Sequence, residues 1–294
     1  MLTIFTPTCN RSNCLRRLAE SLEKQTCWDF EWLIIDDGST DDTREVVEIF
    51  AERLPIRYFF QKNSGKHIAY NNAIRQCRGD WFLCVDDDDF LTPDAVGVCC
   101  GMTGDTAGLL MPRNQAGVDD RHRWKAIDGQ VLRIMDLKWK YGITESAILF
   151  RTSLLKKHRF PVLSDPLGNQ ERYCSEELLY YDLDEEGRFR VLDRCIYVAE
   201  YQPTGLTNQL FRLWMNNPNG ACRMLLKRYE YVSRYSGWRK LSLQCRTILN
   251  WNALHQALCL PAISGSPSPG LSALLWFPGL AFRLYRFPWK GKEK

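Results

Sequence analysis

The chain is predicted to be an α/β protein in which a mostly parallel central sheet carries helices on both faces, followed by a helical C-terminal appendage. Two observations predict this fold. Short apolar runs alternate with amphipathic helical patterns through the first hundred residues, and the connections between them are short. Beyond residue 220 the pattern becomes helical, basic and rich in aromatic side chains. The 294 residues suffice for one sizeable domain and an appendage.

The first strand, residues 2–6, stops at Pro7, which suits the end of a strand better than its middle. Three leucines then recur at helical spacing and predict an amphipathic helix over residues 13–25. The same reasoning predicts strands at 31–36, 56–60, 81–85, 106–111, 147–150, 189–192 and 196–201, and helices at 43–53 and 66–77.

The composition is that of an ordinary globular protein, because 45% of the residues are hydrophobic and 25% are charged. The net charge of +4 conceals a polarised chain. Residues 223–294 hold twelve Lys or Arg against two acids, a net charge of +10, which leaves −6 for residues 1–222. The positive charge of the C-terminal part favours an anionic partner.

No targeting signal stands out. The first residues lack the basic and apolar regions of a secretory signal, and no stretch reaches about 18 uninterrupted apolar residues. The twelve cysteines are scattered, with no CxxC pair and no histidines at zinc spacing. We therefore expect reduced thiols and a cytoplasmic location.

Four consecutive carboxylates, Asp86 to Asp89, follow the apolar strand at 81–85. The carboxyl end of such a strand is where α/β proteins bind ligands, and oxygen ligands suit a hard ion such as Mg²⁺ or Mn²⁺. The alternative is a solvated acidic turn that caps the next helix, because Thr92-Pro93-Asp94 has the chemistry of a helix start. The residues alone leave both interpretations open.

A second strand of the sheet, residues 31–36, also ends in acids, Asp36 and Asp37, which are able to accept hydrogen bonds from a base or a ribose. Lys66 follows a glycine at a helix start, a place that suits contact with a phosphate. A helix-capping loop and a solvated lysine are the alternatives. Neither GxGxxG nor GxxxxGK[ST] occurs, which argues against a dinucleotide dehydrogenase and a P-loop NTPase.

Four segments together resemble the family 2 glycosyltransferases, which have the Rossmann-like GT-A fold: residues 6–11, 34–41, 63–72 and 79–89. The resemblance implies a D-x-D signature with Asp86 and Asp88 as its ends and Asp88 as the main ligand of Mn²⁺ or Mg²⁺. A fourth aspartate leaves the register open by one residue, so Asp87 remains a candidate. The residues that the resemblance assigns to the nucleotide sugar are Thr6, Pro7, Thr8, Asn10, Arg11, Asp36, Asp37, Gly38, Ser39, Gly65, Lys66, Asn71, Asp86 and Asp87.

Glu176 and Glu177 open an apolar helix. Taken alone, such a pair is most simply explained by the favourable interaction of acids with a helix N-terminus. The resemblance instead implies that an acid at this place is the catalytic general base. The family pattern is Glu-Asp and this chain has Glu-Glu, so the assignment is divided between the two residues, with Glu176 preferred from its spacing to Glu171.

We predict a catalytic domain over residues 1–220, with the nucleotide sugar bound by 1–105 and the acceptor by 106–220, and a helical tail over 221–294. Apolar and aromatic side chains mixed with cations after residue 270 suit the surface of an anionic membrane. A tail packed on the catalytic domain is the alternative. A nucleic-acid site fits less well, because the aromatic residues lie among aliphatic ones.

The resemblance implies an inverting glycosyltransferase that moves a sugar, with UDP the family's commonest nucleotide, and the basic aromatic tail adds the expectation of a glycan or lipid-linked glycan acceptor in O-antigen, capsule or exopolysaccharide assembly. It would be peripheral to the inner face of the cell membrane. A sugar nucleotidyltransferase ranks lower, because its glycine-rich loop is missing after the first strand. A non-catalytic nucleotide-sugar-binding module is the other alternative.

Overall fold

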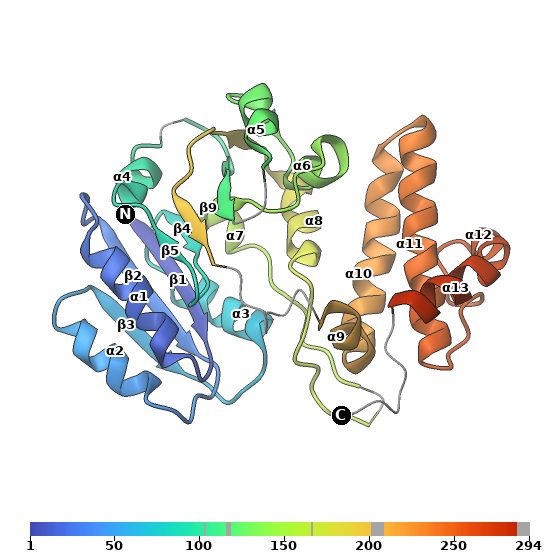
Figure 1. Cartoon of the computed structure of the whole chain (residues 1–294), viewed down its shortest axis with the longest axis horizontal. Helices are drawn as coiled ribbons and strands as arrows, with labels where there is room; N and C mark the ends of the chain where they lie inside the picture. The colour runs from blue at the N-terminus through green and yellow to red at the C-terminus, as the bar shows by residue number, and fades with distance from the viewer. Residues whose placement is uncertain (103, 116–118, 166, 201–208, 287–294) are drawn as a thin grey trace. The chain divides into compact units, whose positions relative to one another are not determined.

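A computed structural model describes residues 1–102, 104–115, 119–165, 167–200 and 209–286 (Figure 1). The chain divides into two compact units, Met1–Phe160 with Asp182–Gln202, and Pro161–Tyr181 with Pro203–Lys294. The second unit thus takes in residues 161–181 as well as the C-terminal helices, whereas the catalytic domain was predicted over residues 1–220. The end of the tail, 287–294, lies outside the described residues.

The first unit is built on a mixed, mostly parallel sheet of eight strands in the order β3-β2-β1-β4-β9-β6-β10-β8. Strands β3, β2, β1 and β4 are mutually parallel, β9 runs antiparallel to its neighbours β4 and β6, and β10 is parallel to β6. The strands are β1 Leu2–Thr8, β2 Phe30–Asp36, β3 Ile56–Phe60, β4 Trp81–Cys84, β6 Gly108–Met111, β8 Val131–Leu132, β9 Ala147–Arg151 and β10 Phe189–Val191. The predicted α/β class and parallel start of the sheet are confirmed.

Helices cover both faces of the sheet, as the alternation of side chains along β1 shows. Leu2 and Ile4 join the apolar core beneath α1 and α2, whereas Phe5, the next residue along the strand, points to the other face and packs edge-on to Tyr70 of α3 at 5.2 Å. The helices of this unit are α1 Ser12–Glu23, α2 Thr43–Ala51, α3 Lys66–Gln76, α4 Ala95–Cys100, α5 Arg121–Ile127, α6 Ile134–Tyr141, α7 Thr152–Leu155 and part of α8 Glu177–Glu186.

The register of the parallel strands brings their carboxyl ends together. Thr8 at the end of β1 lies opposite Asp36 at the end of β2, and Phe5 lies opposite Cys84 at the end of β4. The loops that follow these three strands therefore leave the sheet at one edge, and they contain the predicted site residues Asn10, Arg11, Asp37, Gly38, Ser39 and Asp86 to Asp88.

A small sheet that the sequence pattern did not predict in full lies in the same unit. It has the order β5-β11-β7, with β5 Phe90–Leu91, β7 Arg113–Gln115 and β11 Tyr197–Ala199. The predicted strand at 196–201 corresponds to β11, although residue 201 lies outside the described residues. Strands β5 and β7 are too short for periodicity to reveal them.

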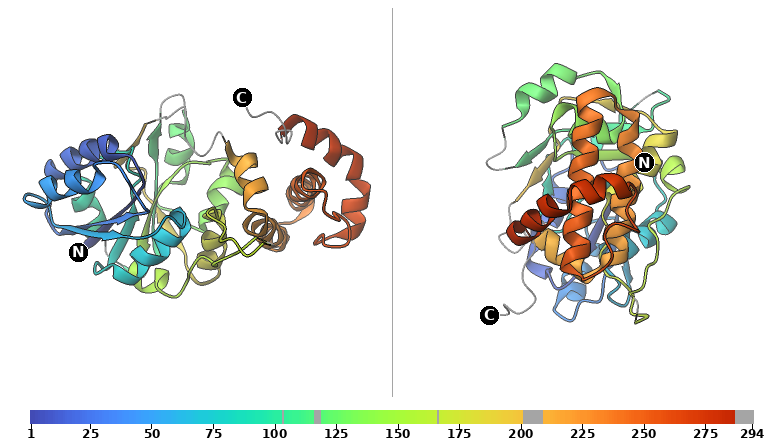
Figure 2. Two further views of the ribbon diagram at one scale, coloured as in Figure 1. Left: turned by 90° about the horizontal axis from the view of Figure 1, so that it is seen from below. Right: turned by 90° about the vertical axis from the view of Figure 1, so that its right-hand side faces the viewer.

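The second unit is helical, with α9 Leu210–Asn216, α10 Pro218–Tyr231, the short 3₁₀ turn η2 Val232–Arg234, α11 Gly237–Ala257, α12 Pro269–Leu274 and α13 Trp276–Arg286. Figure 2 shows α13 crossing the longer α11. In the part of the chain that the structure describes, no helix has both the length and the apolarity to cross a membrane. All twelve cysteines are free thiols.

Candidate active site

The four aspartates after β4 alternate between open and buried environments. The side chains of Asp86 and Asp88 are 32% and 16% exposed, whereas those of Asp87 and Asp89 are 4% and 1% exposed. The backbone of this turn thus points alternate carboxylates outward and into the protein. The two outward ones are the residues that the resemblance implies as the ends of the D-x-D signature.

Arg11, in the loop after β1, joins two of these carboxylates. Its Nη1 donates to Asp87 Oδ1 at 2.7 Å and its Nη2 donates to Asp88 Oδ2 at 2.8 Å. Thr8 Oγ1 donates to the other oxygen of Asp87 at 2.9 Å. Burial raises the pKa of Asp87 to about 7, with Asp88 and Asp86 adding to the rise and Arg11 and Thr8 opposing it.

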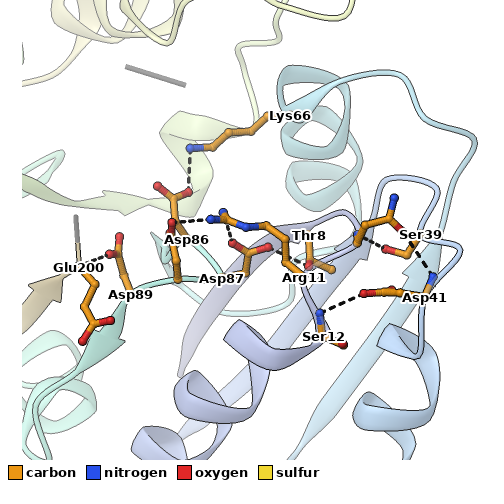
Figure 3. Close-up of polar contacts among 12 residues, drawn as sticks. Thr8, Arg11, Ser12, Ser39, Asp41, Lys66, Asp86, Asp87, Asp89 and Glu200 are labelled. Atoms are coloured by element: carbon orange, nitrogen blue, oxygen red, sulfur yellow. Dashed lines mark hydrogen bonds and ion pairs between the residues drawn. The ribbon is translucent and has the colours of Figure 1, made fainter. Parts of the chain in front are cut away.

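Lys66 pairs with the outward carboxylate Asp86, and its Nζ lies 2.7 Å from Asp86 Oδ1 (Figure 3). Burial pushes the pKa of Asp86 upward, but the charge of Lys66, helped by Arg113 and Arg11, outweighs this effect and lowers the pKa below its usual value. Two cations, Arg11 from the loop after β1 and Lys66 from the start of α3, therefore lie beside the acids that face outward.

Asp89 is a structural residue of this turn. It accepts hydrogen bonds from Arg113, from Tyr197 Oη at 2.7 Å and from the backbone N–H of Glu200 at 2.9 Å. The Tyr197 hydroxyl also accepts the backbone N–H of Asp86 at 3.1 Å. Arg113 and Tyr197 come from β7 and β11, and sequence reasoning missed both because no motif connects them to the aspartates.

Asp36 and Asp37 at the end of β2 have different partners, and both are buried. Asp36 accepts the backbone N–H of Ser39 at 2.8 Å and the hydroxyl of Tyr58 at 2.6 Å. Burial, together with this hydrogen bond to Asp36, raises the pKa of the Tyr58 hydroxyl. Each oxygen of Asp36 has a further lone pair for a ligand.

Asp37 fixes the start of α3. Its two oxygens accept the backbone N–H groups of Ser64 and Gly65 at 2.7 and 2.8 Å, and Gln61 donates to it as well. Gly65 has φ +93°, which a residue with a side chain rarely adopts, and Lys66 follows directly. Asp37 therefore positions the helix start that carries Lys66.

Asn10 connects the loop after β1 with the loop after β2. It has φ +54°, its Oδ1 accepts the backbone N–H of Thr40 at 2.7 Å, and its own N–H donates to Ser39 Oγ at 2.8 Å. The loop after β2 requires a glycine at position 38. Its φ is +89°, and a Cβ there would lie 2.8 Å from the backbone nitrogen of Asn63. These two loops form one hydrogen-bonded structure beside Arg11.

Other predicted residues act within the fold. Thr6 is fully buried and its hydroxyl accepts the indole N–H of Trp32 at 3.0 Å. Asn71 exchanges two hydrogen bonds with the backbone of Phe160, each 2.9 Å long. Pro7 pairs in register with Ile35 and is partly exposed at the same sheet edge.

Glu176 and Glu177 lie in the second unit and differ in their partners. Glu177 accepts hydrogen bonds from Arg228 and from the hydroxyl of Tyr181, both at 2.6 Å. Glu176 accepts one from Tyr180 Oη at 2.8 Å. A guanidinium stabilises the ionised form of a carboxylate, so Arg228 holds Glu177 as an anion within the second unit.

Two contacts hold the segment before this helix against α10. Glu171, which is buried, accepts the backbone N–H groups of Asn219 and Gly220 at the N-terminus of α10, at 2.8 and 2.7 Å. The Oδ1 of Asn217 accepts the N–H groups of Arg172 and Tyr173. These bonds fix the backbone that leads to Glu176.

Among the residues described, no group of three or more His, Cys, Asp and Glu side chains is arranged to hold a metal ion. The two outward carboxylates nevertheless fit a hard divalent ion that takes one or two protein carboxylates and completes its shell with phosphate oxygens and water. The arrangement therefore suits a metal that binds together with a diphosphate.

A model of the family described as glycosyl transferase family 2 matches residues 3–159, more than half of the chain. The chain belongs to glycosyl transferase family 2. The matched range contains the loops after β1, β2 and β4 and the start of α3, so family membership and the grouping of charged residues concern the same part of the molecule.

Curated relatives include polysaccharide synthases and a transferase that is named for an undecaprenol-linked substrate. The chondroitin synthase of Pasteurella multocida is 35% identical over 205 residues, which are 67% of this chain and 20% of that protein. The GalNAc(5)-diNAcBac-PP-undecaprenol β-1,3-glucosyltransferase of Campylobacter jejuni is 27% identical over 199 residues, 65% of this chain and 62% of that protein. The chain thus spans about a fifth of the synthase and under two thirds of the transferase.

Solved structures share the GT-A fold. S. aureus TarS (residues 1–349), determined in complex with UDP-GlcNAc, superposes with a TM-score of 0.61 at 16% identity, covering 100% of this chain and 98% of that one. The mannosyltransferase PcManGT of Pyrobaculum calidifontis, in complex with GDP-Man and Mn²⁺, gives a TM-score of 0.55 at 17% identity over 97% and 81% of the two chains. At these identities the likeness concerns the fold.

Proposed function

We propose that this chain is an inverting glycosyltransferase that transfers a sugar from a nucleotide-diphosphate sugar, with UDP as the nucleotide, to a hydroxyl of a lipid-linked glycan during surface polysaccharide synthesis. The observation that carries the proposal is the turn at residues 86–89, where Asp86 and Asp88 point outward beside Arg11 and Lys66. This pairing of outward acids and cations suits a diphosphate with its divalent ion.

Asp86 and Asp88 would hold the ion, Mn²⁺ or Mg²⁺. When bound, the metal supplies positive charge that stabilises the leaving nucleoside diphosphate. Arg11 and Lys66 add cationic side chains for the phosphate oxygens, and Asp36 offers its oxygens to the base or ribose. Asp87 and Asp89 keep the turn in shape through Arg11, Thr8, Arg113 and Tyr197.

Glu176 is the proposed general base from its place at the start of the helix and its spacing to Glu171, while Glu177 forms an ion pair with Arg228. Its carboxylate would take the proton of the acceptor hydroxyl, and that oxygen would form a bond to the anomeric carbon. The bond from this carbon to the diphosphate would break, with its electron pair leaving on the phosphate oxygen. One such displacement inverts the anomeric configuration.

A lipid-linked acceptor would place the enzyme at the inner face of the cell membrane. Two observations support this part of the proposal. The C. jejuni relative is named for an undecaprenol-linked substrate, and the C-terminal residues 223–294 carry a net charge of +10. Nucleic acid is not an expected partner, because the aromatic residues of the tail lie among aliphatic ones.

The test is thermal unfolding with UDP, dTDP or GDP, each with Mn²⁺, Mg²⁺ or EDTA, followed by transfer assays with the matching nucleotide sugars. A nucleotide at about 100 times its Kd should raise stability by about 2.7 kcal/mol. Metal-dependent stabilisation by UDP with release of UDP on transfer supports the proposal. Binding without turnover would favour a non-catalytic module, and no stabilisation by any nucleotide would contradict the proposal.

A further inference from the structure

The C-terminal helices expose several large apolar side chains. Leu274, Phe277, Leu280, Leu284 and Tyr285, here called the apolar stripe, are between 36% and 80% exposed. They account for five of the sixteen exposed large hydrophobic residues in the described chain, within twelve positions. From Phe277 onward their spacing of three, four and one follows one side of helix α13, and the small Ala281 lies between them on that side.

The opposite side of α12 and α13 is docked on α11, so the stripe does not belong to the interior of the second unit. Gly279 is buried against Asn252, where a Cβ would approach the Asn252 Cβ to 2.7 Å. Asn252 also donates to the carbonyl of Ser272 at 2.9 Å, and Gln256 donates to that of Trp276 at 3.1 Å. These contacts fix the rotation of α13, and its apolar side chains remain exposed.

The charged residues around the stripe in the sequence are all basic. No Asp or Glu occurs from residue 231 to residue 292, a segment that contains eight Lys or Arg. Arg286 lies at the end of α13, with its guanidinium 5.1 Å from the ring of Tyr285. An exposed apolar face whose charged neighbours in the sequence are all cations suits a partner that is both apolar and anionic.

We propose that the apolar stripe is the surface by which this chain lies on an anionic lipid bilayer, with α13 in the plane of the headgroups. An amphipathic helix with aromatic and aliphatic side chains on one face and cations beside it binds at this boundary. A second copy of the chain fits less well, since pairing two stripes would bring like charges together. The inference rests on the proposed function in one respect only, namely that the membrane would carry the lipid-linked acceptor.

The experiment is co-sedimentation of the full chain with vesicles made of equal parts phosphatidylglycerol and phosphatidylcholine, and with vesicles of phosphatidylcholine alone. The F277S/L284S variant removes the centre of the stripe and should lower affinity for the anionic vesicles by about tenfold or more. The matched control is F60S, because Phe60 is 62% exposed but lies on β3 of the first unit. F60S should bind as the unaltered chain does.

Arg286→Glu tests the charge without shortening the stripe. It should weaken binding to the anionic vesicles and reduce the loss of binding on adding salt. Circular dichroism confirms that each variant is folded.

Three outcomes would overturn the proposal. They are equal binding by F277S/L284S and the unaltered chain, equal binding to neutral and anionic vesicles, and a change in oligomeric state without vesicle binding. None of these readouts uses donor or acceptor, so transfer to a water-soluble acceptor tests the proposed function separately.

Discussion

Arg11 Nη2 lies 2.8 Å from Asp88 Oδ2, so a guanidinium occupies one oxygen of the carboxylate that is the strongest candidate for a metal ligand. Arg11 is held there by a second bond to Asp87, which is itself anchored by Thr8. A divalent ion that takes this oxygen of Asp88 must displace the guanidinium. Once displaced, Arg11 is near enough to the same site to meet the phosphates of the donor.

Replacing Arg11 by alanine should therefore raise the affinity for Mn²⁺ alone and lower the affinity for UDP with Mn²⁺. Loss of one competing charge-assisted hydrogen bond predicts a gain of about tenfold for the metal. Electron paramagnetic resonance of free Mn²⁺ measures the first effect and calorimetry the second. Arg16→Ala is the control, because Arg16 lies 4.0 Å from the exposed Asp42. Weaker Mn²⁺ binding by R11A would contradict the competition.

Asp88→Asn and Asp89→Asn should have opposite consequences. Asp88→Asn should abolish stabilisation by UDP with Mn²⁺ while leaving the unliganded melting temperature nearly unchanged, because the Asp88 side chain is partly exposed. Asp89→Asn leaves Arg113 without its buried carboxylate and should cost about 3 kcal/mol of unfolding free energy. Urea unfolding with and without UDP and Mn²⁺ separates the two. The reverse pattern would move the metal register by one residue, to Asp87 and Asp89.

Glu176→Gln should lower the transfer rate by about 10²- to 10⁴-fold without lowering stability or nucleotide affinity, as expected for a general base. Glu177→Gln should instead destabilise the chain by about 3 kcal/mol, because Arg228, which is 12% exposed, loses its anionic partner. Transfer rates under saturating donor, together with urea unfolding, check both expectations. A transfer defect confined to E177Q would assign the base to Glu177.

His67 should make the fold sensitive to mild acid. Burial lowers the pKa of His67 to about 4 from its ordinary 6.5, and the nearby charge of Asp37 opposes this only in part. The unfolded chain therefore takes up a proton below pH 6.5 that the folded chain accepts only near pH 4. Stability should fall by up to about 3 kcal/mol as the pH drops through this window.

The measurement is urea unfolding across the window from pH 7 to pH 4, in the unaltered chain and in His67→Gln. The Nδ1 atom of His67 has no hydrogen-bond partner in the described structure, so the glutamine removes the titrating group without breaking a known bond to that atom. The variant should show a flatter dependence of stability on pH. An identical slope in both proteins would show that other groups cause the acid sensitivity.

Much of the first unit was predictable because its elements are local patterns. Apolar runs marked β1 to β4, and the acids that end β2 and follow β4 marked the edge where the site lies. Short strands such as β5 and β7 were missed, since two or three residues carry no period. The grouping of residues 161–181 with the C-terminal helices was also missed, because it depends on contacts between Glu171 and α10 that are distant in sequence.

The α/β class, the family and the set of acids and cations around the site follow from spacing and residue type, which can be read along the chain. How those acids and cations are used depends on the folded structure. In the folded chain, Asp86 and Asp88 point outward, whereas Asp89 is bound by Arg113 and Tyr197. Asp37 accepts hydrogen bonds from the start of α3, and Glu177 forms an ion pair with Arg228. Each of these outcomes depends on burial and on a partner far away in the sequence, and only folding brings such partners together.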